Sequence, residues 1–463
     1  MHGRAGAQAA ECDAEMSALK ATAQHVLDVA LKAGADDAVA EAVEIDVSQV
    51  RFSNSQIDAI NAWTEKSVIL FVAVGKRVMS SDLRELDKLD ALTQEVVSLA
   101  KKAPTSKTYG GIASGKFKYA KPMIDKRILS LDDPSKPALE AIAGAEEEGA
   151  VNVGGTLFVR HSAAGIASSG GALAFDENAS LDLSVRAFTQ PEASGHALSC
   201  TPRLSALKPR ETGQRAGQLA SRAKNPVQGE QGKFDIIIEP MCLTELINTT
   251  SNMMSAMLVE IGSSMYAKKI GKPVASKQVT FIDDPTIESM SRQNFDHEGV
   301  PTRRNVVIKD GILKTYLHST STAKRFKTKT TANAGPLIPT PFAMATQPMA
   351  FHPLVVPGDW KVEEMISDVK RGLYINNSWY TRYQNYSTGE FSTIPRDAIL
   401  KIENGEIIGA AKNVRISDNM LNLWKGIDAL SKDVEEIYWW DEAAPPSTVP
   451  TVRIRQMNIT RSS

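Results

Sequence analysis

The sequence predicts an α+β protein, with a mixed α/β N-terminal half and a β-rich, barrel-like C-terminal half that contains a long amphipathic helix. Three observations support this fold class. Helical and strand-like patterns are intermixed up to residue 224. A polar segment with one proline and two glycines, residues 225–233, then interrupts the pattern. Beyond residue 262, strand-like runs and tight-turn sequences predominate.

We therefore expect four segments along the chain. They are a flexible extension at 1–16, an N-terminal α+β domain at 17–224, a linker at 225–233 and a C-terminal β-rich domain at 234–463. A chain of 463 residues is long enough for each of the two domains to bury a core of its own.

Four helices and six strands are expected in the N-terminal half. The helices show apolar residues at intervals of three and four, and the strands are rich in valine and isoleucine. Glycines separate the last three strands, so we interpret those strands as short. The expected helices are 17–32, starting at Ser17, 86–102, 135–148 and 213–223, and the expected strands are 38–52, 67–74, 77–80, 154–160, 165–168 and 180–189.

The C-terminal half is expected to begin with a buried strand at 234–238, followed by one continuous helix at 243–261 with a Leu/Ile/Met stripe. Two hairpins follow, at 305–317 and 398–408. Their turns, Asp310-Gly311 and Asn404-Gly405, accommodate the positive φ of type I′ turns. A further helix is expected at 362–371.

Composition excludes several classes of partner. The formal net charge of −1 provides no overall attraction to nucleic acid or to anionic lipid, so we expect neither as a partner. No apolar run approaches the ~20 residues that span a bilayer, and the first 16 residues lack the apolar stretch of a secretory signal. The three cysteines form no CxxC pair and are odd in number, so we expect no disulfide framework, which fits the reducing cytoplasm.

The helix at 243–261 contains no histidine. A zinc peptidase helix needs two histidines about one turn apart, with a glutamate that activates water. The polar positions of this helix are occupied instead by Asn248, Thr249 and Asn252, whose amides and hydroxyls are poor zinc ligands. We therefore expect neither catalytic nor metal-binding residues, and no cofactor, in this chain.

A series of short motifs resembles the TldD/PmbA family, once named modulators of DNA gyrase. The main one is FDHEGVPTRRNVVIKDGILKTYL at 295–317, with His297 where a second Asp is usual. The others follow the family order from residue 17 to residue 460. They include Asp283-Asp284-Pro285, TANA at 331–334 with Ala332 in place of Gly, STGEFS at 387–392 and IENGEI at 402–407.

The resemblance implies a function. TldD-type subunits carry a His-Glu-x-x-x-His helix and a late cysteine that complete a zinc site, whereas TldE/PmbA-type subunits lack both and pair with TldD. This chain lacks the histidines, and its late segment 435–446 has no cysteine. The resemblance therefore implies a non-catalytic TldE/PmbA-like subunit of a cytoplasmic zinc metallopeptidase that degrades or processes unfolded peptides. The implied partner is a TldD-like, zinc-carrying subunit in a heterodimer, with a homodimer as the alternative.

Two other functions remain open from the residues. The chain could be an autonomous metallohydrolase with a non-standard site, for which His297, His318 and His352 are the candidate ligands, or a hydrolase with a spatially assembled Ser-His-Asp triad. It could also be a non-enzymatic regulatory or binding homodimer. We interpret His297 as a loop residue that forms local hydrogen bonds. One further candidate site is an aromatic group that either packs in the core or lines a peptide groove, namely Trp379, Tyr380, Tyr383 and Tyr386.

Overall fold

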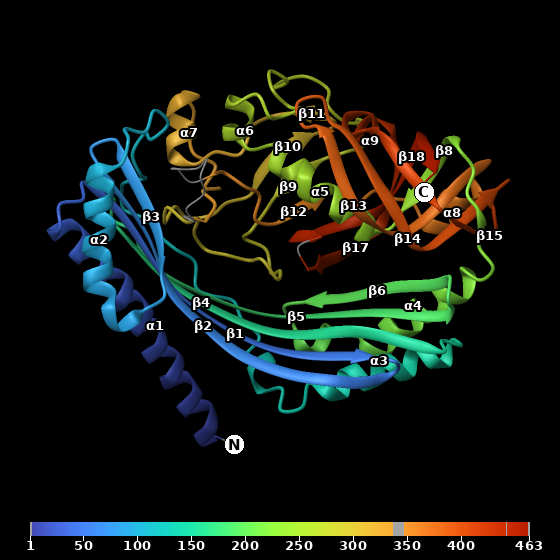
Figure 1. Cartoon of the computed structure of the whole chain (residues 1–463), viewed down its shortest axis with the longest axis horizontal. Helices are drawn as coiled ribbons and strands as arrows, with labels where there is room; N and C mark the ends of the chain where they lie inside the picture. The colour runs from blue at the N-terminus through green and yellow to red at the C-terminus, as the bar shows by residue number, and fades with distance from the viewer. Residues whose placement is uncertain (1, 337–346, 441, 462–463) are drawn as a thin grey trace.

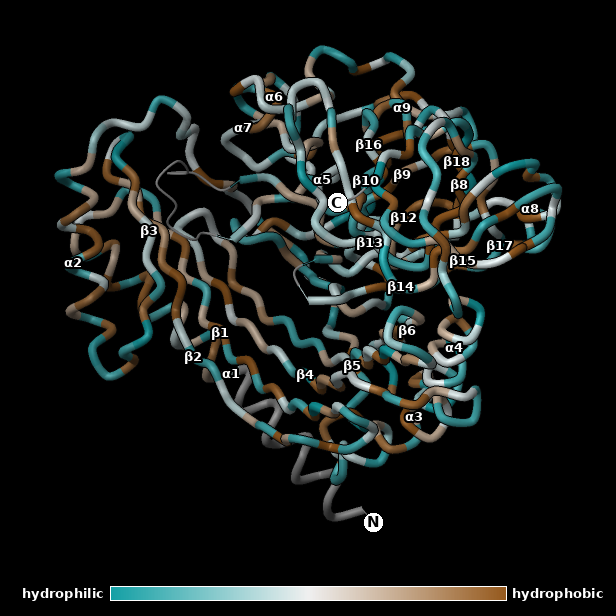
Figure 2. The backbone as a smooth tube through the Cα atoms, turned by 45° about the vertical axis from the view of Figure 1, so that its right-hand side comes forward, coloured by the Kyte–Doolittle hydropathy of each residue, from teal (hydrophilic) through white to brown (hydrophobic). Residues whose placement is uncertain are grey.

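The computed structural model of the chain describes residues 2–336, 347–440 and 442–461. It confirms the α+β class. Two large sheets face each other, one from each half of the chain, and the helices of the N-terminal half cover the outer face of the N-terminal sheet (Figure 1). In Figure 2 the hydrophobic residues follow the strands and the interior of the C-terminal half, whereas the connecting loops are mostly hydrophilic.

The N-terminal sheet has six antiparallel strands in the order β3-β2-β1-β4-β5-β6. The expected short strands after residue 152 are wrong, because β4 and β5 are long and continuous and a further strand, β6, follows them. The glycines within β4 are not turns, whereas Gly170 and Gly171 do form the turn between β4 and β5. A Cβ at Gly155 would lie 2.0 Å from the Ser184 carbonyl oxygen, so this glycine permits a close backbone approach. The strands are β1 Asp37–Ser53, β2 Gln56–Val74, β3 Arg77–Leu83, β4 Asn152–Ser168, β5 Leu173–Gln190 and β6 Ala193–Thr201.

Four helices pack on this sheet, and all four were predicted. The first begins at His2, so the expected start at Ser17 is wrong. It buries Ala23, Val26 and Ala30 against the sheet. The helices are α1 His2–Lys32, α2 Leu89–Lys102, α3 Ser135–Glu147 and α4 Pro209–Arg222, and the 3-10 turns are η1 Leu86–Lys88, η2 Ile128–Ser130 and η3 Leu204–Ala206.

Helices α3 and α4 approach closely through glycines. A Cβ at Gly213 would lie 1.9 Å from the carbonyl oxygen of Ala141. We expect Gly213→Ala to lower the free energy of unfolding by about 1–3 kcal/mol, because overpacking outweighs the gain of about 1 kcal/mol in helix propensity. Chemical denaturation measures the change. The exposed Glu211→Ala on the same helix serves as the control and should stay within about 0.5 kcal/mol. A stabilised Gly213→Ala variant would contradict this packing.

The C-terminal sheet has twelve strands, and its main path runs from β11 to β7 without closing end to end. Strand β16 pairs with both β14 and β18, so part of the sheet curls back on itself in the barrel-like manner that the sequence predicted. Both hairpins are confirmed, with φ of 49° at Asp310 and 48° at Asn404. The segment 225–233 holds β7 and the start of β8, and the division into domains stays a prediction. The strands are β7 Val227–Gln228, β8 Gly232–Ile238, β9 Phe281–Asp283, β10 Asn305–Lys309, β11 Ile312–Leu313, β12 Pro353–Val355, β13 Arg371–Asn385, β14 Glu390–Glu403, β15 Glu406–Lys412, β16 Val414–Asn419, β17 Ile427–Trp439 and β18 Ala443–Arg461.

The single helix expected at 243–261 is instead two helices, α5 Pro240–Met253 and α6 Ala256–Glu260. The break lies at Ser255, whose ψ of 124° is extended. There the Leu317 amide donates to the Met254 carbonyl at 2.9 Å, and the Ala256 amide donates to the Leu317 carbonyl at 3.0 Å. This bridge from a distant segment replaces helical hydrogen bonds, and no periodicity within the helix predicts it.

The remaining C-terminal helices are short. The helix expected at 362–371 ends at Ser367, because β13 already begins at Arg371. Two more helices were not predicted. The three are α7 Thr320–Arg325, α8 Val362–Ser367 and α9 Met420–Gly426. Across the described residues, we find no helix with the length and apolar character needed to cross a membrane.

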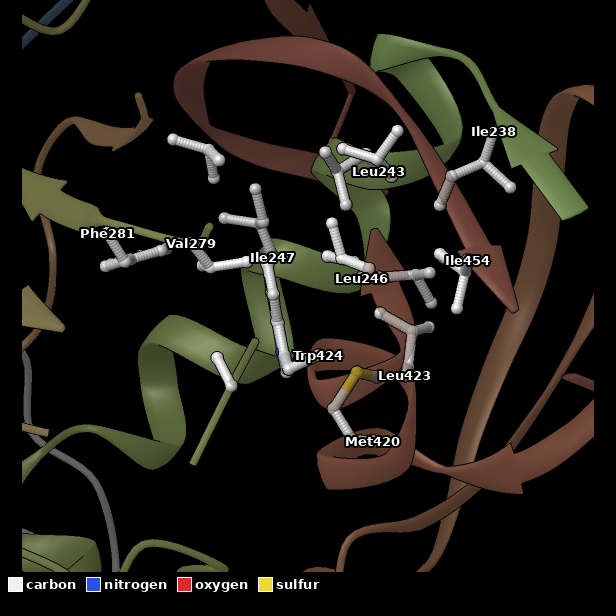
Figure 3. Close-up of a cluster of buried hydrophobic side chains, with 14 of the residues drawn as sticks. Ile238, Leu243, Leu246, Ile247, Val279, Phe281, Met420, Leu423, Trp424 and Ile454 are labelled. Atoms are coloured by element: carbon white, nitrogen blue, oxygen red, sulfur yellow. The ribbon is translucent and has the colours of Figure 1, made fainter. Parts of the chain in front are cut away.

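Helix α5 is a core helix. Its Leu243, Leu246 and Ile247 lie among side chains of β8, β9, α9 and β18 (Figure 3). The Trp424 indole of α9 donates to the Thr250 hydroxyl at 3.2 Å. Apolar packing on one side and this hydrogen bond fix the helix rigidly, so its half-buried polar positions are held in place as well.

Candidate functional site

Two polar positions of α5 are hydrogen-bonded to each other. Asn248, Thr249 and Asn252 are half-buried, and the Asn252 amide donates to Asn248 Oδ1 at 3.3 Å. These amides and hydroxyls do not fit a zinc ion, which prefers imidazole, thiolate or carboxylate ligands. Within 2–336, 347–440 and 442–461, no three His, Cys, Asp or Glu side chains are grouped so that they could hold a metal.

Glu245 of α5 is 5% exposed and joins the helix to β13. Its carboxylate accepts hydrogen bonds from the hydroxyls of Ser378 and Thr381, the latter at 2.5 Å. Burial raises the pKa of Glu245, and the two hydroxyl donors offset only part of this effect. Both carboxylate oxygens are therefore used to hold β13, which leaves Glu245 unsuited to activating water.

The thiol nearest to this network, that of Cys242, has no exposed surface and donates to Ser378 Oγ at 3.2 Å. Burial, with the neighbouring Glu245, raises the pKa of Cys242. A neutral buried thiol is a poor nucleophile, so Cys242 acts as a packing residue.

Strand β13 bulges beside Glu245. Its pairing with β14 shifts register between Trp379 and Arg382. Within the bulge Tyr380 has φ of 63°, a conformation that is strained for a bulky side chain, and its ring is 52% exposed. The Thr381 hydroxyl donates to the buried Glu245 carboxylate. This hydrogen bond fixes the bulge, in which Tyr380 is exposed to solvent.

Four rings form a continuous chain, which we call the aromatic strip: Tyr380, Trp379, Trp439 and Trp440. Successive ring centroids lie 6.2, 6.4 and 6.0 Å apart. Trp440, at the far end, also has a positive φ, 48°, and is 55% exposed. Strained residues of this kind gather at functional sites, and here both ends of the strip are strained and exposed.

Two arginines lie over the aromatic strip. The guanidinium carbon of Arg396 is 4.2 Å from the Trp379 centroid, and that of Arg382 is 4.3 Å from the Tyr380 centroid. Each distance suits a cation–π contact. In the described part of the chain, no carboxylate forms an ion pair with either arginine. The strip therefore combines ring faces with cationic groups.

The four predicted groove residues do not form one group. Trp379 and Tyr380 belong to the aromatic strip, whereas Tyr383 and Tyr386 stack on each other at 5.2 Å, with Tyr383 also near Phe391. Sequence reasoning missed Trp439 and Trp440. Their adjacency at the end of a strand-like run was a signal that could have indicated them.

The three candidate histidines have separate partners. His297 Nδ1 lies 2.6 Å from Glu41 Oε2, 256 residues earlier, so the expected local bonding is wrong. His352 lies between the hydroxyls of Ser291 and Thr448, at 2.8 and 3.0 Å. The His318 ring packs on Phe326. Burial lowers the pKa of His318 and of His352 to about 4, so both rings are neutral at pH 7.

One Ser-His-Asp grouping does occur. Ser184 Oγ is 2.9 Å from His196 Nε2, and His196 Nδ1 is 3.9 Å from Asp397 Oδ2. However, the Asn377 amide nitrogen lies 3.0 Å from Nδ1, so Nδ1 accepts and Nε2 donates to Ser184. This is the reverse of a nucleophile-activating triad. Burial also lowers the pKa of His196 to about 3, so its ring stays neutral.

The C-terminal half matches a known protein family. The model of the PmbA/TldA metallopeptidase C-terminal domain matches residues 231–461. The chain belongs to the TldD/PmbA family. Two curated relatives are named metalloproteases. A metalloprotease of Methanocaldococcus jannaschii is 34% identical over 212 residues, 44% of this chain and 45% of the relative. A metalloprotease of Methanothermobacter thermautotrophicus is 30% identical over 228 residues, 48% of each protein.

These two curated matches span slightly less than half of either relative, whereas the likeness in fold covers nearly all of this chain. The crystal structure of TldE from Thermococcus kodakarensis has a TM-score of 0.83 and covers 95% of this chain and 100% of that one, at 19% identity. At that identity the likeness shows the fold alone.

Proposed function

We propose that this chain is the TldE/PmbA-like, non-catalytic subunit of a cytoplasmic TldD/TldE-type zinc metallopeptidase that processes unfolded peptides. One observation carries the proposal: α5 is a rigid, buried helix whose polar positions hold an Asn-Asn pair instead of zinc ligands. A TldD-like partner would supply the zinc ion and the catalytic groups.

Within such a complex, we assign to this chain a role in positioning peptide. The exposed ends of the aromatic strip, Tyr380 and Trp440, offer rings that accept apolar side chains, whereas Trp439 is only 7% exposed. Arg382 and Arg396 offer guanidinium groups to carboxylates. Glu245 links the strip to α5 through Thr381. The strip is therefore anchored on a rigid element, as a binding surface requires.

Zinc content and peptide hydrolysis of the purified chain test the proposal, measured alone and after mixing with a TldD-like protein. We expect the chain alone to be free of stoichiometric zinc and inactive, and the mixture to hydrolyse peptide faster than the TldD-like protein alone. Stoichiometric zinc and activity in the chain alone would overturn the proposal. A metal-free chain that never raises the partner's activity would support a regulatory or binding homodimer instead.

The α5 asparagines give a sharper test. We expect Asn248→Ala and Asn252→Ala each to leave the activity of the mixture within about threefold, because neither amide contacts a metal or a reacting atom in the proposed complex. Initial rates at saturating and limiting peptide measure the change. A loss of several orders of magnitude from either substitution would mean that α5 takes part in catalysis.

Tyr380 should show opposite effects on stability and binding. Tyr380→Gly removes an exposed ring and relieves the positive φ, so we expect stability to be unchanged or up to about 1 kcal/mol higher. Peptide affinity should fall about tenfold, a typical loss for one aromatic anchor. Thermal denaturation and fluorescence anisotropy with a labelled unfolded peptide measure the two effects. Tyr386→Gly, similarly exposed but outside the aromatic strip, is the matched control. Equal losses in both variants would argue against the strip.

A further inference from the structure

One face of the C-terminal sheet, across β13, β14 and β16, carries three arginines. In the pairing of β13 with β14, Trp379 lies opposite Ile394 and Arg382 lies opposite Ser392. Side chains that are opposite each other share a face, and residues two apart on a strand do so as well. Arg396, two residues beyond Ile394, therefore lies on the same face as Arg382.

The third arginine comes from β16. Arg415 Nη1 donates to Ser392 Oγ at 3.4 Å, which places Arg415 on the same face. We call Arg382, Arg396 and Arg415 the arginine face. None of the three forms an ion pair with a carboxylate of residues 2–336, 347–440 or 442–461. Alternation along β14 also places Glu390 on this face, and within the same residues it too forms no ion pair.

The contacts of the arginine face orient its guanidinium groups without neutralising them. Arg396 and Arg382 lie over aromatic rings, and Arg415 donates to a hydroxyl. A guanidinium group binds a carboxylate through two parallel N–H···O hydrogen bonds, and it loses less conformational freedom when it is already oriented. The arginine face is therefore prepared for carboxylates that the described residues do not supply.

The spacing of the arginines matches an extended chain. Ser392 and Arg396 are four residues apart on β14, which is about 13 Å at about 3.3 Å per residue. Arg382 and Arg415 flank Ser392 on the two neighbouring strands, and the half-buried Ile394 lies midway between Ser392 and Arg396. In an extended peptide, side chains i, i+2 and i+4 point to the same side and have the same repeat. Carboxylates at i and i+4 with an apolar side chain at i+2 would fit this face.

We propose that the peptides positioned by this chain are acidic, and that the arginine face binds an extended segment with carboxylates four residues apart and an apolar side chain midway. This inference rests on the proposed role in positioning peptide and names its substrate class. Single-stranded nucleic acid also combines anions with rings. However, a net charge of −1 provides no overall attraction to a polyanion, whereas two separate cationic positions suit two carboxylates.

Fluorescence anisotropy of the chain alone, with labelled peptides in a Gly/Ser background, tests the proposal. The first peptide has Glu at i and i+4 and Leu at i+2. In the second, Gln replaces both Glu residues, and in the third, the second Glu is moved to i+3, on the other side of an extended chain. We expect the second peptide to bind at least about tenfold more weakly, and the third about threefold or more. Raising NaCl from about 50 mM to about 500 mM should weaken binding of the first peptide alone.

Arginine variants assign the preference to this face. Arg396→Gln and Arg382→Gln should each remove most of the preference for the Glu peptide over the Gln peptide. Arg396→Glu should instead prefer one of the two peptides in which a single Glu is replaced by Lys. Arg371→Gln is the matched control, because Arg371 is an exposed arginine of the same strand whose Nη2 already lies 2.7 Å from Glu230. It should keep the full preference. Circular dichroism shows whether each variant is folded.

Three outcomes would overturn the proposal. They are equal affinity for the Glu and Gln peptides, a preference that persists in the Arg382 and Arg396 variants, and equal affinity for the i+3 and i+4 peptides. Tighter binding of an oligothymidylate that the same substitutions abolish would overturn it in favour of nucleic acid. Because the chain is assayed alone, these results are separate from those of the zinc and mixing experiment. A mixture that never hydrolyses peptide faster overturns the proposed function, whereas the peptide preference decides this inference.

Discussion

Replacing Asp283 with alanine is expected to lower the free energy of unfolding by about 3–5 kcal/mol. Asp283 has no exposed surface. Its carboxylate accepts from the amides of Phe351 and His352, both at 2.8 Å, and from Asn333 Nδ2 at 2.6 Å. Alanine leaves these buried donors without that acceptor, and each unsatisfied donor costs about 1–3 kcal/mol. Urea denaturation at constant pH measures the loss.

The same residue predicts a pH dependence. Burial raises the pKa of Asp283 to about 6, although the Asn333, His352 and Phe351 donors oppose this. A carboxyl group whose folded pKa is raised contributes stability below its unfolded pKa of about 4 and loses it as pH rises through about 6. Asp283→Asn keeps an acceptor oxygen but cannot titrate. Relative to this variant, wild-type stability should fall by about 3 kcal/mol between pH 4 and pH 7.

Asp359→Ala, at an exposed aspartate, is the control and should change stability by less than about 0.5 kcal/mol at any pH. A similar loss in both alanine variants would show that the Asp283 hydrogen bonds contribute little. A flat difference between wild type and Asp283→Asn would show that the carboxyl group titrates normally.

The features predicted correctly from the sequence depend on neighbouring residues. Asp310-Gly311 and Asn404-Gly405 specify their turns by their own backbone preferences, and both hairpins are present. The four helices of the N-terminal half were found because each shows its buried stripe directly in the sequence. The family blocks were recognisable for the same reason, since each is a short contiguous motif.

The features that were missed depend on distant contacts. Leu317 interrupts the helix at Ser255, and nothing near Ser255 indicates it. The glycines of β4 suggested turns, yet Gly155 lies within the strand, where a Cβ would meet the carbonyl oxygen of Ser184 on β5. The ring contact between Trp379 of β13 and Trp439 of β17 likewise depends on two strands that are far apart in the sequence. The sequence did contain a signal for Glu245, because it is the sole charged residue of the otherwise apolar and uncharged α5.

The second large effect is expected at the ion pair between the halves of the chain. Glu41, on β1, is 4% exposed, and its carboxylate lies 2.6 Å from Nδ1 of His297, in the C-terminal half. His297→Ala leaves the carboxylate buried without its cation, so we expect a loss of about 3–5 kcal/mol. Glu41→Gln should cost less, about 1–2 kcal/mol, because the imidazole that remains can become neutral and still accept a hydrogen bond.

The double variant separates this coupling from the two individual losses. If the pair is a real interaction, His297→Ala and Glu41→Gln together should cost at least about 1 kcal/mol less than the sum of the single losses. Burial alone would lower the pKa of His297, but the Glu41 carboxylate outweighs burial and raises it. The coupling should therefore be fully present below about pH 6.5 and shrink as pH rises through the raised pKa. Strictly additive losses, or a coupling that grows at alkaline pH, would mean that the two halves are held together elsewhere.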